Sequence, residues 1–134
     1  VAGRRVLVIG RSRIVGEPMA RQLLNRDATV TIAHSETPVD LLVTLISDAD
    51  IIVSATGKAG LVKASQTKEN AVIIDVGISY SPDGKLLGDL CVDEVGRRRY
   101  TPVPGGVGPV TVAKLVENLF HTFLIQIKAS NKQS

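Results

Sequence analysis

The chain has 134 residues and a formal net charge of +3; 44% of the residues are hydrophobic, 22% are charged and 3% are aromatic. This balance is typical of a globular protein with one apolar core, so we expect a single domain over residues 1–134. No apolar run is long enough to span a membrane, no signal peptide is recognisable, and the scarcity of aromatic side chains argues against nucleic acid as a partner. The single cysteine, Cys91, excludes an internal disulfide and indicates an intracellular protein.

Short β-branched runs alternate with segments of helical periodicity along the chain. Strands are expected at residues 6–9, 29–32, 51–53 and 72–74, and helices at about 15–25, from about 38 onward and at about 110–128. Uninterrupted Val and Ile runs are typical of strands buried on both faces of a parallel sheet. The alternation therefore predicts an α/β fold, a Rossmann-like doubly wound sheet, mostly parallel, with helices on both faces.

Three local patterns refine this prediction. Thr37 is expected to cap the helix that opens at Pro38, where a missing N–H costs nothing. Asp83 and Gly84 indicate a tight turn or hairpin. We assign no element to residues 88–100, which are mostly polar.

The last helix has a wide apolar side with His121 expected at its boundary. Its apolar residues follow the spacing i, i+3, i+4. They are Val112, Leu115, Val116, Leu119, Phe120, Phe123, Leu124 and Ile127.

The segment between the first strand and the first helix, residues 10–16, reads Gly-Arg-Ser-Arg-Ile-Val-Gly. Gly10 permits a tight turn, Ser12 is small enough for close backbone approach to a pyrophosphate, and Gly16 allows helix and strand to pack closely. The following helix offers N–H groups and a partial positive charge. The alternative is an ordinary glycine-containing turn, but the position after the first strand favours dinucleotide binding.

The end of the second strand indicates which dinucleotide. NAD-binding sheets carry an Asp or Glu there for the ribose hydroxyls, whereas this chain has His34 and Ser35. Together with Arg11, which can form charge-assisted bonds to phosphate oxygens, they favour NADP over NAD. Two alternatives stay open: Arg11 could be a solvated surface residue, and Glu36 could still reach a ribose.

Two segments carry a resemblance to a known family: residues 8–18, which contain the turn, and residues 101–109, which read TPVPGGVGP. Shorter matches lie at residues 33–35, 55–58, 74–78 and 88–89. From about Gly3 to Asn118 the chain resembles the cofactor-binding domain of the bifunctional methylenetetrahydrofolate dehydrogenase/methenyltetrahydrofolate cyclohydrolase family.

The resemblance implies oxidation of 5,10-methylenetetrahydrofolate by hydride transfer to NADP⁺ and hydrolysis of the methenyl product to 10-formyltetrahydrofolate, within one-carbon metabolism. It matches Arg11 and Ser35 to positions facing the 2′-phosphate. With the turn and the loop after the third strand, the expected cofactor-binding residues are Gly10, Arg11, Ser12, Gly16, His34, Ser35, Thr56, Gly57 and Ile78. The expected loop bordering nicotinamide and folate contains Gly105, Gly106, Val107, Gly108 and Pro109.

The loop at residues 101–109 also makes physical sense by its composition. Its three prolines stiffen the backbone, and its three glycines leave space for a flat ligand against the main chain. The alternative is a simple connection between the last strand and the last helix, but such a connection would need fewer prolines and fewer glycines.

Other residues receive structural interpretations. Asp75 is expected to form structural hydrogen bonds, Cys91 to fill space in the core, and residues 97–99 to form a solvated basic surface. Lys58 could be solvated or could face a ligand. No metal-ligand spacing is present, so no metal site is expected.

The family enzyme is about twice as long, and its amino-terminal half carries a Tyr-x-x-x-Lys motif and most of the folate pocket. Here Tyr80 is followed four residues on by Gly84, and Tyr100 by Pro104. We therefore assign no catalytic residue to this chain and expect it to bind cofactor without turnover. The start at Val1 fits an isolated domain or fragment.

The expected partners are a folate substrate shared with that amino-terminal domain and, in the full-length protein, a second copy in a homodimer. The expected location is the cytoplasm, or the mitochondrion. Without the other domain, the apolar side of the last helix should be exposed or covered by self-association. Two alternatives are another NADP-dependent oxidoreductase and a stand-alone nucleotide-binding or regulatory module.

Overall fold

The centre of the molecule is a sheet of five parallel strands in the order β2-β1-β3-β5-β9. The structure, a computed structural model, describes residues 1–92, 96 and 98–130. The strands of this sheet are β1 (Arg5–Ile9), β2 (Thr29–Ala33), β3 (Ile51–Ser54), β5 (Val72–Asp75) and β9 (Arg99–Tyr100). The parallel sheet with its helices confirms the predicted Rossmann-like fold class.

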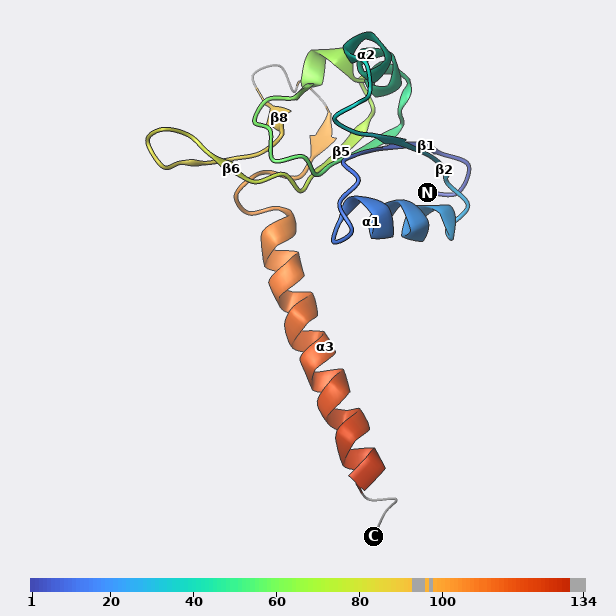
Figure 1. The fold of residues 1–134 in the computed structure, drawn as a ribbon, viewed down its shortest axis with the longest axis vertical. Helices are drawn as coiled ribbons and strands as arrows, with labels where there is room; N and C mark the ends of the chain where they lie inside the picture. The colour runs from blue at the N-terminus through green and yellow to red at the C-terminus, as the bar shows by residue number, and fades with distance from the viewer. Residues whose placement is uncertain (93–95, 97, 131–134) are drawn as a thin grey trace.

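Two helices, α1 (Gly16–Leu24) and α2 (Val39–Asp48), lie on opposite sides of the sheet (Figure 1). Successive side chains of a strand point to opposite faces, so β1 contributes to two apolar clusters. Val6 and Val8 belong to the cluster that contains Leu23 of α1, whereas Leu7 belongs to the one that contains Ile46 of α2. The sheet is therefore buried on both faces at its centre.

The edge strand β2 differs from the expectation of burial on both faces. Thr31 and Ile32 are exposed, and Ile32 retains 43% of its accessible surface. The apolar pattern of this strand indicated its conformation correctly. Its burial depends on neighbouring elements, and β2 has β1 on one side only.

Several short elements lie outside the central sheet. β4 (Val62–Lys63) pairs with β8 (Leu90–Cys91), and the 3-10 helix η1 (Ala64–Gln66) follows β4. β6 (Ser79–Tyr80) and β7 (Leu86–Leu87) form an antiparallel hairpin. Gly84 adopts φ +79° in the connecting turn, which confirms the predicted hairpin.

The basic residues 97–99 do not form one solvated group. The Arg98 guanidinium donates from Nε to Thr67 Oγ1 at 2.8 Å and from Nη2 to the Thr67 carbonyl at 3.0 Å. The prediction of a solvated side chain is therefore wrong for Arg98, because the fold brings η1 beside β9. Arg99 is exposed in β9, and Arg97 lies outside the described residues.

The last helix, α3 (Val107–Ser130), projects away from the sheet (Figure 1). Every residue from 108 to 129 is exposed, including the apolar ones. The exposed apolar side is therefore confirmed, but His121 lies at no packing boundary because the residues on all sides of α3 around it are exposed. In the described part of the chain, no helix is long and apolar enough to cross a membrane.

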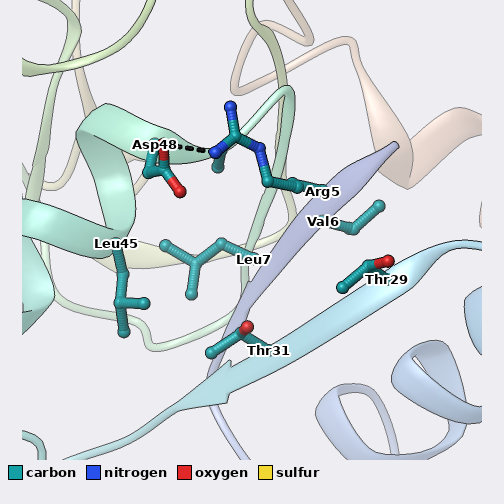
Figure 2. Close-up of a pocket in the computed structure, with 8 residues that line it drawn as sticks. Arg5, Val6, Leu7, Thr29, Thr31, Leu45 and Asp48 are labelled. Carbon is teal, nitrogen blue, oxygen red and sulfur yellow. Dashed lines mark hydrogen bonds and ion pairs between the residues drawn. The ribbon is translucent and has the colours of Figure 1, made fainter. Parts of the chain in front are cut away.

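At the amino ends of the strands there is a hollow of about 80 Å³ between β1, β2 and α2 (Figure 2). Arg5 and Asp48 form an ion pair at its rim, and both side chains are more than half exposed. Asp50 lies at the same edge, where bonds from Lys68 and from the Arg5 backbone lower the pKa of its carboxyl to about 2. These contacts connect chain segments at the edge opposite to the loops that follow β1, β2 and β3.

Candidate functional site

The carboxyl ends of β1, β2 and β3 lie side by side. Ile9 is in register with Ala33 and with Ser54, so the segments that follow the three strands begin at the same edge. The Gly10 N–H donates to the Ala33 carbonyl at 2.8 Å, and the Ala55 N–H donates to the Ile9 carbonyl at 2.9 Å. Ligands of open α/β sheets bind at this edge.

A cavity of about 370 Å³, here called the first cavity, opens between these segments. It brings together six of the predicted cofactor-binding residues, from three separate segments of the chain: Gly10, Arg11, Ser12, His34, Ser35 and Thr56. Lys58 also lines it. Gly16, Gly57 and Ile78, which belong to the same prediction, do not line this cavity.

Gly10 and Gly16 allow close packing of the turn between β1 and α1. A Cβ atom at Gly10 would lie 2.6 Å from the Ala55 carbonyl oxygen, and one at Gly16 would lie 2.2 Å from the Gly10 carbonyl oxygen. Gly10 also has φ +120°, which side-chain-bearing residues rarely adopt. Gly16 thus lies behind the turn and shapes it, rather than facing the first cavity.

Ser12 has a role that the sequence interpretation missed. Its Oγ accepts hydrogen bonds from the N–H groups of Val15 at 3.2 Å and Gly16 at 3.4 Å. The amino terminus of α1 is therefore partly capped from within the turn. A serine shortly before the expected helix was the available signal, because serine commonly satisfies free N–H groups there.

Residues 34–37 form a tight turn after β2. The Thr37 N–H donates to the His34 carbonyl at 2.9 Å, and the His34 N–H donates to Thr37 Oγ1 at 2.9 Å. The predicted capping role of Thr37 is therefore wrong: its hydroxyl closes this turn, and Pro38 occupies the N-cap position of α2 without a side-chain bond. The Glu36 N–H donates to His34 Nδ1 at 3.2 Å, so a neutral His34 carries its ring hydrogen on Nε2.

The segment after β3 is hydrogen-bonded to Asp89, whose carboxylate is fully buried. Asp89 Oδ2 accepts from Ser54 Oγ at 2.7 Å, and from both the N–H and the hydroxyl of Thr56 at 2.8 Å each. The Thr56 hydroxyl in turn accepts from the Lys58 N–H at 3.1 Å. Thr56 thus lines the first cavity while its hydroxyl is engaged in these bonds. The sequence singled out Asp89 only through the family resemblance.

Asp75 and Asp89 are adjacent buried carboxyls. Asp75 Oδ1 accepts from the N–H groups of Gly77 and Asp89, and Oδ2 accepts from that of Leu90. Burial raises the pKa of the Asp75 carboxyl above its ordinary value; these N–H bonds oppose the rise and the charge of Asp89 adds to it. The predicted structural role of Asp75 is confirmed, and the pair fixes the loop that leads to Ile78.

A second cavity, of about 400 Å³, lies between the loop after β5 and the start of α3. Ile78 lines it together with all five residues of the predicted substrate-bordering loop, Gly105, Gly106, Val107, Gly108 and Pro109. The last three already belong to the first turn of α3, where a proline is well tolerated. Gly106 is required here, because a Cβ atom would lie 2.4 Å from the Pro102 carbonyl oxygen.

Gly57 and Cys91 lie outside both cavities. Gly57, with φ +69°, lies near Ile78, since a Cβ atom on it would be 3.3 Å from the Ile78 carbonyl oxygen. Cys91 in β8 is half-buried rather than a core residue. Among the described residues, no group of three or more His, Cys, Asp or Glu side chains is placed to hold a metal ion.

The sequence is similar to those of one family of enzymes. The model of the family described as "Tetrahydrofolate dehydrogenase/cyclohydrolase, NAD(P)-binding domain" matches residues 1–127. The chain is 52% identical to the bifunctional protein FolD of Campylobacter concisus over 120 residues, and 50% identical to that of Methanoculleus marisnigri over 133 residues. These matches cover 88% and 98% of the chain but only 42% and 46% of the relatives, so the chain spans less than half of their length.

Solved structures give the same relationship. A methylenetetrahydrofolate dehydrogenase-cyclohydrolase of Trypanosoma brucei, in complex with NADP cofactor and an inhibitor, superposes with a TM-score of 0.88 and 44% identity, over 95% of this chain and 46% of that one. A 5,10-methylenetetrahydrofolate dehydrogenase of the silkworm Bombyx mori superposes with a TM-score of 0.87 and 45% identity. That match covers 96% of this chain and 47% of the silkworm chain.

Proposed function

Because the chain belongs to the family of tetrahydrofolate dehydrogenase/cyclohydrolase NAD(P)-binding domains, we propose that it is the NADP-binding part of a longer enzyme. That enzyme oxidises 5,10-methylenetetrahydrofolate and hydrolyses the methenyl product to 10-formyltetrahydrofolate. The single observation that carries the proposal for this chain is the convergence of residues 10–12, 34–35, 55–56 and 58 on the first cavity. The NADP complex of the Trypanosoma brucei relative supports the choice of cofactor.

The residues present suit a dinucleotide phosphate. Gly10 and Gly16 have no side chain at two tight contacts of the turn, and α1 directs its amino terminus toward the turn, where the positive end of the helix dipole favours anionic groups. Arg11 and Ser35 line the same cavity. In this proposal the Arg11 guanidinium and the Ser35 hydroxyl bind the 2′-phosphate, and the turn holds the pyrophosphate.

The nicotinamide end would lie toward the second cavity. Its lining is mostly main chain and apolar side chains from residues 75–78 and 102–109. Bound NADP⁺ supplies the acceptor for a hydride. The residues of this chain orient the nicotinamide ring and exclude water from it, and Asp75 keeps the loop before Ile78 in place from its buried position.

The exposed apolar side of α3 supports the view that this chain works as part of a larger protein. Ten large apolar residues between positions 110 and 127 are exposed. An apolar surface of this extent is rare on an isolated soluble protein. We propose that the remainder of the longer enzyme, which contributes the folate-binding and catalytic groups, packs along α3, and that the complete enzyme forms a homodimer in the cytoplasm or the mitochondrion.

Nucleotide titration tests the cofactor assignment. The chain should bind NADP⁺ more tightly than NAD⁺, and Arg11→Ala should weaken NADP⁺ binding by roughly ten- to a hundred-fold while changing NAD⁺ binding little, the size expected for hydrogen bonds to a charged group. Isothermal titration calorimetry measures both affinities.

Arg13→Ala is the matched control for this titration. Arg13 belongs to the same turn and is exposed, but it does not line the first cavity. This variant should leave the preference for NADP⁺ unchanged. Equal affinities of the parent chain for the two nucleotides, or equal effects of the two Arg variants, would contradict the assignment of the 2′-phosphate site.

A further inference from the structure

A carboxylate contacts one residue of the proposed 2′-phosphate site, although Glu36 itself does not line the first cavity. Ser35 Oγ donates a hydrogen bond to Glu36 Oε1 at 3.1 Å, and both residues are exposed. The hydroxyl that would donate to the 2′-phosphate is thus already donating to an anionic group of the protein. Arg11 lies in the adjoining wall of the first cavity.

The position of Glu36 is set by the turn after β2. Ser35 and Glu36 are its two central residues, closed by the bond from the Thr37 N–H to the His34 carbonyl. The Glu36 N–H is bound to His34 Nδ1. The carboxylate is therefore attached to a stretch of backbone that these two hydrogen bonds hold in place.

Among the residues that the structure describes, no basic side chain forms an ion pair with Glu36. Of the four ion pairs recorded for the described residues, none includes Glu36 or Arg11. A 2′-phosphate bound between Arg11 and Ser35 would therefore meet attraction from the guanidinium and repulsion from the Glu36 carboxylate. It would also compete with that carboxylate for the Ser35 hydroxyl.

The same carboxylate suits a ribose without the 2′-phosphate. An acidic side chain near the end of the second strand is the group that accepts hydrogen bonds from the ribose hydroxyls in NAD-binding sheets. Glu36 lies three residues after Ala33, the last residue of β2. The Glu36 carboxylate therefore weakens binding of NADP, which carries the 2′-phosphate. It can accept hydrogen bonds from the ribose hydroxyls of NAD, which does not carry it.

We propose that Glu36 is a specificity-determining residue that narrows the preference of this chain for NADP over NAD. It does so by holding the Ser35 hydroxyl and by adding one negative charge beside the 2′-phosphate site. The inference rests on the proposed function, because it assumes that the adenosine end of the dinucleotide lies in the first cavity.

Two variants separate the two effects of Glu36. Glu36→Gln removes the charge but keeps an oxygen that can accept from Ser35 Oγ, whereas Glu36→Ala removes both. Glu36→Gln should tighten NADP⁺ binding by about five-fold, the size of a single contact-range repulsion in water, and Glu36→Ala by at least as much. Neither variant should tighten NAD⁺ binding. The gain in NADP⁺ affinity should shrink as ionic strength rises, because salt screens exposed charges.

Glu69→Gln is the matched control. It makes the same charge change at an exposed position before β5, at the opposite edge of the sheet, and should alter neither affinity. In a Ser35→Ala background, the extra effect of Glu36→Ala over Glu36→Gln should disappear.

Calorimetric titration of NADP⁺ and NAD⁺ into the parent chain and these variants distinguishes the possible failures. If both nucleotides bind but the ratio of their affinities stays within about two-fold of the parent value in both Glu36 variants, the inference about Glu36 is wrong and the proposed function stands. If neither nucleotide binds the folded parent chain, both are wrong. An equal gain from Glu69→Gln would also overturn the role of Glu36, since net charge alone would then account for the effect.

Discussion

Gly77 is the residue at which a single added carbon should be most disruptive. A Cβ atom there would lie 1.9 Å from Asp89 Oδ1 and 2.1 Å from Asp89 Cγ. Asp89 has little freedom to move aside, because it is fully buried and its other oxygen accepts three hydrogen bonds. Asp89 Oδ1, which has no hydrogen-bond partner in the described part of the chain, occupies the space that a side chain at Gly77 would need.

We therefore expect Gly77→Ala to lower the free energy of unfolding by about 3 kcal/mol, the upper part of the range for overpacked sites. Urea denaturation followed by circular dichroism measures this change. Gly108→Ala is the control, because no atom lies within 4 Å of the Cβ position there and Gly108 is exposed in the first turn of α3. If the Gly77→Ala protein were as stable as the Gly108→Ala protein, the Asp89 side chain would be able to move away from the added carbon at little cost.

Among the elements, α3 shows how an amphipathic pattern can be real without being buried. Its apolar residues recur at helical spacing, and the helix forms over that segment. Burial needs a second surface, however, and in this chain α3 leads away from the sheet (Figure 1). The first and the last elements therefore differ: β1 lies inside the sheet, between β2 and β3, whereas no residue of α3 belongs to either apolar cluster.

Replacing Leu115 and Leu119 together by lysine should leave the free energy of unfolding within about 0.5 kcal/mol of the parent value, since the two side chains are 68% and 70% exposed and lysine favours helix about as much as leucine. The same double variant should reduce self-association, which sedimentation velocity measures. Leu7→Ala, at a core position only 1% exposed, should instead cost about 2–5 kcal/mol. A double variant that unfolds as readily as Leu7→Ala would mean that α3 folds back onto the sheet in solution.

At the level of the entire molecule, the two cavities suit binding better than catalysis. Hydride transfer requires the substrate carbon to be held in contact with the nicotinamide, and much of the rate comes from that positioning. The second cavity offers main chain, apolar side chains and Asp75, whose oxygens are already engaged by three N–H groups. No side chain there is placed as an acid or base for folate chemistry among the residues that the structure describes.

The chain by itself should therefore bind NADP⁺ without oxidising 5,10-methylenetetrahydrofolate. Absorbance of NADPH at saturating substrate provides the measurement, with a full-length relative as the positive control. Co-expression with the remaining part of such a relative should restore turnover if that part packs along α3. Robust turnover by the chain alone would contradict the assignment of all catalytic groups to the rest of the enzyme.

Local patterns in the chain were sufficient to predict the parallel sheet, the turn at residues 10–16 and the grouping of Arg11 with Ser35. The turn depends on residues that are close in sequence. The sheet, and with it the grouping of Arg11 with Ser35, depends on a strand order that follows from the alternation of strands and helices. The hairpin around Gly84 is of the same kind, because its turn residues and both strands lie within nine residues.

Other features depended on contacts between distant segments. Asp89 reaches Thr56 across 33 positions, and Arg98 reaches Thr67 across 31, which no local spacing encodes. Thr37 was a plausible helix cap by sequence, yet its hydroxyl closes the turn after β2 because the backbone there brings the His34 N–H within reach. Burial of β2 was likewise decided by which neighbours the folded chain provides. A hydrophobic pattern determines which side of an element can be buried, and only the tertiary arrangement determines whether another surface covers it.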